Sequence, residues 1–299
     1  MYLLIENSIL LFIIVSLVAG NNLSATSGAI IGSRTVSRFG GALIGFAGYS
    51  LGYLIEGARM TEAARNLLPP DPYYVTALFF ITAVIFVVAE LLRSPLSLTM
   101  ALVGASIGIS LKHGFSLNYP FIYLLVATWI LAPLLGIGIS YVANRQISRK
   151  NWNYQWRTAR VFKVLMIFVS VFTGFTLGAN TMGLIGGFYG TGAVGTAIMI
   201  GGIGFGSFFL GRGTLRRVGQ DMFSLKYSNA LVSSTVSASL VQAATVLGVP
   251  LSNTQTLTSS VFGCGLSYKT RAIFVRPFLV VVLIWMVSPI SGMLMGYLI

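Results

Sequence analysis

The sequence predicts an all-α integral membrane protein with two inverted-topology repeats of about five membrane segments each, including broken or re-entrant half-helices. Three observations support this. Hydrophobic residues make up 56% of the chain and charged residues only 8%, whereas soluble domains have about 25% charged residues. Nearly the whole length lies in apolar runs, and residues recur in order between the two halves. A chain with so few charges cannot cover a water-facing surface, so we expect it to lie in a lipid bilayer.

The apolar runs have close to the roughly 20 residues that a helix needs to cross a bilayer. They are continuous rather than alternating, which favours helices over the strands of a barrel. Near the N-terminus, Glu6 and no Lys or Arg precede the apolar stretch from Ser8 to Ala19, so we expect a retained span rather than a signal peptide. The runs fall at about 3–19, 40–55, 74–92, 96–111, 118–142, 161–178, 198–211, 228–247, 252–266 and 277–298.

Matched residues indicate that the chain is a tandem duplication. The motif Pro-Leu-Ser-x-Thr occurs at 95–99 and again, 155 positions later, at 250–254. Asn21 matches Asn180, and a Trp-x-x-x-Pro-x-x-Gly pattern ends both halves. We therefore divide the chain into three parts. These are a first membrane repeat (1–142), a basic cytoplasmic loop (143–160) and a second, inverted membrane repeat (161–299).

The distribution of basic residues predicts the orientation. Five crossings per repeat is an odd number, so the two copies must point in opposite directions. With 143–160 in the cytoplasm, all but three of the 19 Lys and Arg residues lie inside, as the positive-inside rule requires, and both termini lie outside. The exceptions are Arg59, Arg65 and Lys112. Topology thus explains the net charge of +13, and we expect no binding of nucleic acid.

Four segments interrupt the apolar pattern. The stretches AGNNLSATSGAIIGS, from Ala19, and LGANTMGLIGGFYGTG, from Leu177, are too polar or glycine-rich for a plain lipid-facing helix. Proline suits the first turn of a helix, and Ser or Thr can cap its N–H groups, so both Pro-Leu-Ser-x-Thr copies predict the start of a half-helix. Irregular backbone at membrane depth must be buried in protein or line a cavity. We expect the four segments to meet.

Two helix N-termini aimed at one point form an anion site without a formal positive charge. A lone Ser-x-Thr in a membrane helix more often bonds to its own backbone, but duplication at proline-led positions favours a ligand site. One Cys and one His exclude a disulfide framework and a Cys/His metal cluster, and no cofactor is expected. The candidate substrate-binding residues are Asn21, Asn22, Ser24, Ser97, Thr99, Asn180, Thr181, Ser252, Asn253, Thr254 and Gln255.

The pattern resembles the PiT (inorganic phosphate transporter) family, whose repeats each carry a Gly-Ala-Asn-Asp-x-x-Asn segment and a later Pro-Val-Ser-x-Thr segment. The resemblance covers essentially the whole chain and implies a permease for phosphate, or in some members sulfate, driven by Na+ or H+. The first motif departs from the family pattern, because Asn22 and Thr181 stand where the family has Asp. Since those Asp positions are associated with cation coordination, Asn22 and Thr181 are the candidate cation ligands.

Together these features predict a multi-pass plasma-membrane protein that transports inorganic phosphate by alternating access, with cation coupling. Sulfate or a related oxyanion is the alternative substrate. An anion channel is less favoured, since inverted duplication without a ring of pore-lining charges is typical of secondary transporters. An enzyme is not expected, because the sequence offers no His partner, metal cluster or paired carboxylates. A homodimer is left open.

Overall fold

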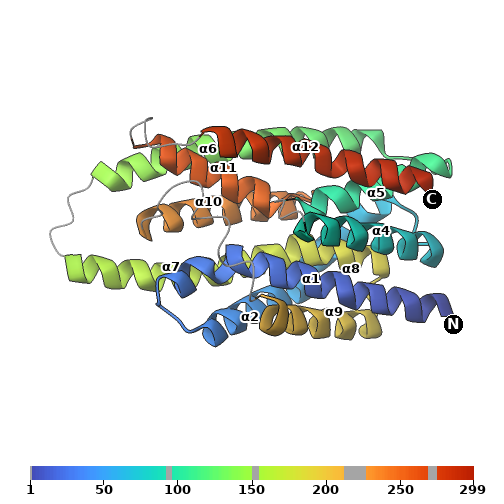
Figure 1. Ribbon diagram of the computed structural model, residues 1–299, viewed down its shortest axis with the longest axis horizontal. Helices are drawn as coiled ribbons and strands as arrows, with labels where there is room; N and C mark the ends of the chain where they lie inside the picture. Colours follow the sequence, from blue (N-terminus) through green and yellow to red (C-terminus); the bar gives the residue numbers. More distant parts are fainter. Residues whose placement is uncertain (1, 92–95, 150–154, 212–226, 269–274) are drawn as a thin grey trace.

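The computed structural model describes residues 2–91, 96–149, 155–211, 227–268 and 275–299, and it is helical with short connections over these ranges (Figure 1). Pro95 and residues 150–154 of the predicted basic loop lie outside the described residues. The helices are α1 (Tyr2–Gly32), α2 (Arg38–Glu56), η1 (Gly57–Arg59), α3 (Met60–Leu67), α4 (Pro72–Leu91), α5 (Leu98–Lys112), α6 (Tyr119–Arg149), α7 (Gln155–Leu177), η2 (Gly178–Met182), α8 (Gly183–Tyr189), α9 (Ala193–Phe205), η3 (Gly206–Leu210), α10 (Tyr227–Val246), α11 (Asn253–Leu266) and α12 (Val275–Leu298).

Within the described residues, six helical stretches are long and apolar enough to cross a bilayer. Helices α2 and α10 have 19 and 20 residues but fall outside this group. Helices α5 and α11 have only 15 and 14 residues. At 1.5 Å per residue each covers about 22 Å, which is less than the roughly 30 Å of the hydrocarbon core. The ten predicted segments are therefore not equivalent. The six stretches are Tyr2–Gly32, Pro72–Ala89, Tyr119–Ser148, Arg160–Tyr189, Ala193–Leu210 and Phe278–Leu298.

The predicted interruption after the first apolar run was wrong, because α1 continues unbroken through it. The Ser24 hydroxyl donates to the carbonyl of Asn21, and the Thr26 hydroxyl donates to that of Asn22, both at 3.1 Å. Side chains that bond to the preceding turn satisfy themselves without leaving the helix. The polarity of this segment thus marks a helix facing protein rather than lipid.

The second interruption is a change of helix type rather than a break. Helix α7 passes through the π-helical turn η2 directly into α8. A Cβ atom on Gly178 would lie 2.1 Å from the carbonyl oxygen of Tyr49 in α2, so only glycine permits this approach of the two backbones. Single π turns inside α-helices are frequent at functional sites.

The two halves of the chain are interlocked. Helix α5 of the first half packs on α12 of the second, and α11 of the second packs on α6 of the first. A Cβ on Gly108 would lie 2.1 Å from the Met293 carbonyl oxygen, and one on Gly263 would lie 2.3 Å from that of Ile137. Helices α1 and α9 pack together, as do α2 and α7. Every one of these close pairs joins one half of the chain to the other.

Both termini lie at one end of the bundle, and the C-terminal end of α6 and the N-terminal end of α7 lie at the opposite end (Figure 1). Lys112, at the end of α5, lies with its ammonium 5.4 Å from the ring centre of Tyr297, near the C-terminus. Asn144, close to the end of α6, donates to the carbonyl of Cys264 in α11. Helices α5 and α11 therefore point to opposite ends of the molecule, and their N-termini lie between.

Candidate functional site

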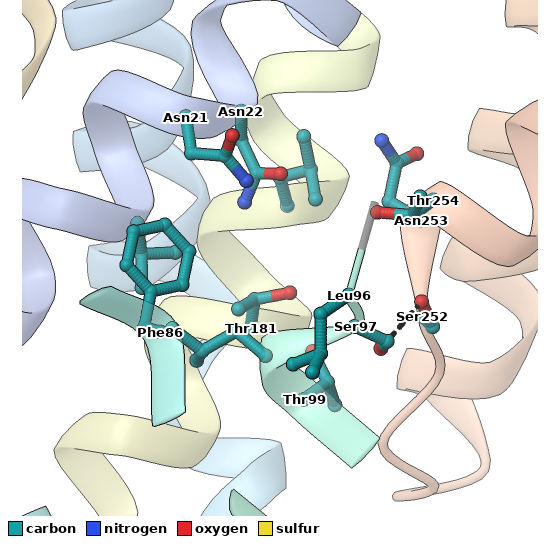
Figure 2. Close-up of a pocket in the computed structure, with 13 residues that line it drawn as sticks. Asn21, Asn22, Phe86, Leu96, Ser97, Thr99, Thr181, Ser252, Asn253 and Thr254 are labelled. Atoms are coloured by element: carbon teal, nitrogen blue, oxygen red, sulfur yellow. Dashed lines mark hydrogen bonds between the residues drawn. The ribbon is translucent and has the colours of Figure 1, made fainter. Parts of the chain in front are cut away.

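The N-termini of α5 and α11 meet through their capping residues. Ser97 caps α5 by accepting a bond from the Met100 amide at 3.3 Å, and Ser252 caps α11 by accepting one from the Gln255 amide at 3.4 Å. The Ser97 hydroxyl also donates to the Ser252 hydroxyl at 2.8 Å (Figure 2). Each helix start carries a partial positive charge from its unpaired N–H groups. Two such ends therefore face one point.

A small pocket lies at this point, bounded by α1, α4, the α7–η2 junction and the starts of α5 and α11 (Figure 2). All of its lining residues are uncharged, so the helix ends and neutral polar groups set its electrostatic character. Its cavity volume is about 10 Å³, which is room for about one water molecule. The lining residues are Val18, Asn21, Asn22, Phe86, Leu96, Ser97, Leu98, Thr99, Leu177, Thr181, Ser252, Asn253 and Thr254.

The structure brings together most of the residues that the sequence singled out, and from all four predicted segments. Those lining the pocket are Asn21, Asn22, Ser97, Thr99, Thr181, Ser252, Asn253 and Thr254. The other three, Ser24, Asn180 and Gln255, are not among the lining residues. Ser24 bonds to its own helix, as described above, while Asn180 and Gln255 have distinct positioning roles.

Asn180 fixes the chain that leads into α11. Its side chain is fully buried. The amide nitrogen donates to the Thr245 hydroxyl and the Val249 carbonyl, and the amide oxygen accepts from the Leu251 backbone N–H, all at 3.0 Å. The side chain thus holds the start of α11 in place against η2 rather than presenting its amide to the pocket.

Gln255 compensates for a proline in α6. Pro133 lacks the N–H that would bond to the carbonyl four residues earlier, which belongs to Trp129. The Gln255 amide nitrogen donates to this carbonyl at 3.0 Å, and the Trp129 indole N–H donates to the Pro250 carbonyl at 3.0 Å. The start of α11 is therefore clamped to α6 by two reciprocal bonds.

Sequence reasoning missed two groups near the pocket. The apolar lining residues, such as Phe86, carry no sequence signal that separates them from core residues. Ser237 of α10 supports the site from behind, because its hydroxyl donates to the Asn253 side-chain oxygen at 3.2 Å. The Ser-rich run of α10 could have indicated a polar face. Ser288 of α12 also contributes, since its hydroxyl accepts from the Ser97 backbone N–H at 3.3 Å.

Apolar helices of bilayer length, enclosing an uncharged polar pocket between two capped helix ends, define a multi-pass membrane protein. The sequence profile of the phosphate transporter family matches residues 18–155 and again residues 142–296. The chain belongs to this family, which confirms the resemblance to the inorganic phosphate transporters.

Known proteins resemble the chain over nearly its whole length. The sulfate permease CysP of Bacillus subtilis is 25% identical over 295 residues, covering 94% of this chain and 82% of that protein. A protein of Methanocaldococcus jannaschii, provisionally named a phosphate permease, is 24% identical and covers 97% of this chain and 95% of its own. A solved structure described as the sodium-dependent phosphate transporter superposes with a TM-score of 0.88, at 18% identity, over 100% of this chain and 98% of its own. That likeness establishes the fold.

Proposed function

We propose that this protein is a secondary transporter that moves inorganic phosphate across the plasma membrane, coupled to a cation. The main supporting observation is the meeting of Ser97 and Ser252 at a pocket with uncharged walls. Helix N-termini bind anions through their N–H groups, and hydroxyl and amide donors can replace the water around an oxyanion. Membership of the phosphate transporter family favours phosphate as that oxyanion.

We propose that the halves are inverted repeats that open the pocket alternately to the two sides of the membrane. The opposite directions of α5 and α11 and the exchanged helix packing support this arrangement. A pocket with room for about one water molecule is too small for a tetrahedral oxyanion. Substrate entry must therefore widen the pocket, and in this proposal the helix ends separate and the 2.8 Å bond between Ser97 and Ser252 breaks. In this proposal α5 and α11 are too short to span the membrane. Each enters and leaves on the same side, and the two helices do so on opposite sides.

Sulfate is a second candidate substrate. Phosphate carries protons and benefits from an acceptor, which a carboxylate supplies best, whereas sulfate only accepts hydrogen bonds. The lining residues include no Asp or Glu. The Bacillus relative, which matches 94% of this chain, is named a sulfate permease. These two observations favour sulfate, whereas membership of the phosphate transporter family favours phosphate, which stays the first candidate.

We propose that coupling depends less on Na+ than the family pattern implies. A Na+ ion at membrane depth needs oxygen ligands and a compensating negative charge, since an isolated charge in a low dielectric is costly. Asn22 and Thr181 line the pocket and offer oxygens, but neither carries a charge. The bound anion would have to supply it, so a proton that enters on the substrate is the favoured coupling ion.

Uptake into proteoliposomes tests the proposal. The purified protein should accumulate labelled phosphate, sulfate or both. A lost donor to a buried anion costs about 1.5–3 kcal/mol, so Thr99→Ala and Ser252→Ala should each lower apparent affinity roughly ten- to a hundredfold. Ser106→Ala is the control, because among the described residues this buried hydroxyl of α5 bonds only to the Val103 carbonyl of its own helix. Near wild-type uptake by both pocket variants would refute the site.

A further inference from the structure

The two copies of the Pro-Leu-Ser-x-Thr motif differ at their variable position. Ser97 matches Ser252 and Thr99 matches Thr254, but Leu98 of the first copy is replaced by Asn253 in the second. Both variable residues are buried and both line the pocket. Burying an amide is costly unless it is hydrogen-bonded. Leu98 shows that a half-helix can start with an apolar residue here, so starting α11 does not by itself require the amide of Asn253.

The amide of Asn253 is only half satisfied. Its oxygen accepts from the Ser237 hydroxyl at 3.2 Å. Its nitrogen is buried and has no hydrogen-bond partner among the described residues. The side chain lies on the α11 side of the pocket, across from Asn21 and Asn22 (Figure 2). The oxygen end of this amide is therefore held by α10, and the nitrogen end is left without a partner among the described residues.

The hydroxyl groups behind Asn253 allow its amide to be held in either of two orientations. The Ser237 and Thr256 hydroxyls lie 2.7 Å apart, and either can be the donor. The Thr256 hydroxyl also lies 3.1 Å from the backbone carbonyl oxygen of Asn253. When Thr256 donates to Ser237, Ser237 donates to the amide oxygen and the amide NH2 faces the pocket. When Thr256 donates to the backbone carbonyl of Asn253 instead, Ser237 donates to Thr256 and accepts from the turned side-chain amide. A reversed amide keeps nearly the same atomic positions.

We propose that Asn253, backed by Ser237 and Thr256, allows one site to accept both sulfate and protonated phosphate by presenting either a donor or an acceptor to the substrate. The NH2 group donates to any oxyanion oxygen, including those of sulfate. The turned amide presents its oxygen, which accepts from the P–OH group of a protonated phosphate. The pocket can then satisfy both anions at this position. This inference rests on the proposed transport of a tetrahedral oxyanion and adds the residue that adapts the site to either anion.

Two substitutions should shift selectivity in opposite directions. Asn253→Asp leaves only acceptors, so at pH 8, chosen to keep the carboxyl ionised, apparent affinity for sulfate should fall roughly ten- to a hundredfold relative to phosphate. Thr256→Val removes the hydroxyl to which Ser237 donates when the amide is turned. It should keep the NH2 group facing the pocket and raise the sulfate-to-phosphate ratio roughly two- to tenfold.

The measurement is the apparent KM for labelled phosphate and for labelled sulfate in proteoliposomes, for wild type and each variant. Asn253→Leu, which copies Leu98, should raise the apparent KM for both anions by similar factors and leave the sulfate-to-phosphate ratio unchanged. Asn118→Asp makes the same chemical change on an exposed loop and should leave both values unchanged.

The outcomes separate the inference from the proposed function. A wild-type protein that carries neither anion would refute the proposed function and this inference with it. Transport by the wild type, with a ratio that stays within about twofold in Thr256→Val and in any Asn253→Asp protein that folds, would overturn the inference alone. Because Thr256→Val is close to isosteric and adds no charge, it tests the inference even where Asn253→Asp does not fold.

Discussion

Asn21 and Asn180 occupy matched positions in the two copies of one motif, and the structure uses them differently. Asn21 is half-buried and lines the pocket on α1. Asn180 is fully buried and uses both ends of its amide to hold the segment that precedes α11. The first copy therefore supplies a candidate ligand, and the second supplies a support for the opposite helix end.

The difference teaches that duplication copies residue types but not their surroundings. The same divergence occurs at Gln255, which bonds to the carbonyl that Pro133 leaves without a helical donor, while the matched residue of the first copy is Met100. In both cases the second copy has gained a bond that positions α11. The symmetric elements are the capping serines, because each begins a half-helix in the same way.

The largest expected effect is on the free energy of unfolding, which should differ between substitutions of the two asparagines. Asn180→Ala leaves the Leu251 N–H and the Val249 carbonyl buried without partners, so the free energy of unfolding should fall by about 3 kcal/mol. Asn21→Ala should leave it within about 1 kcal/mol of wild type while impairing uptake. Thermal unfolding in detergent, with uptake in proteoliposomes, measures both. Equal destabilisation by the two variants would contradict the division of roles.

A second, smaller effect should be shared by the two halves. Gly108→Ala and Gly263→Ala each push a methyl group against a backbone carbonyl of the other half, so each should destabilise the protein by about 1–3 kcal/mol. Gly138→Ala is the control, because a Cβ there meets no atom within 4 Å. Melting temperatures in detergent provide the comparison. If only one of the matched glycines proved sensitive, the exchanged packing of the halves would not be equivalent.

The smallest expected effect concerns the two positions where the family has Asp. Wild-type uptake at fixed pH should change only modestly when choline replaces Na+, since Asn22 and Thr181 are neutral. Asn22→Asp adds a negative charge beside the pocket and should make uptake more dependent on Na+. The same assay on Thr181→Asp shows whether the second copy responds alike. Abolition of wild-type transport in choline would show that neutral ligands suffice for a Na+ site.

The sequence by itself determined those features that depend on a few adjacent residues or on composition. Charge content and apolar runs require a helical membrane protein, and the Ser of each Pro-Leu-Ser motif marks the start of α5 or α11 because N-capping is a local interaction. The placement of proline in the first turn was wrong for α11, because Pro250 lies two residues before the capping Ser252. The repeated motif identified the segments that form the pocket. The same local reasoning failed for α1, where polar residues were expected to break a helix that continues through them.

Only the tertiary structure decided which polar side chains face the pocket and which support it. Asn180 bonds to a carbonyl 69 positions away, and Gln255 bonds to one 126 positions away. A hydrogen bond forms only when the partner lies within about 3 Å, and distances of that kind across the fold are not encoded in the spacing of a motif. The chain therefore specified a polar meeting point of four segments, while the packing of α6, α7 and α10 around it assigned the role of each residue.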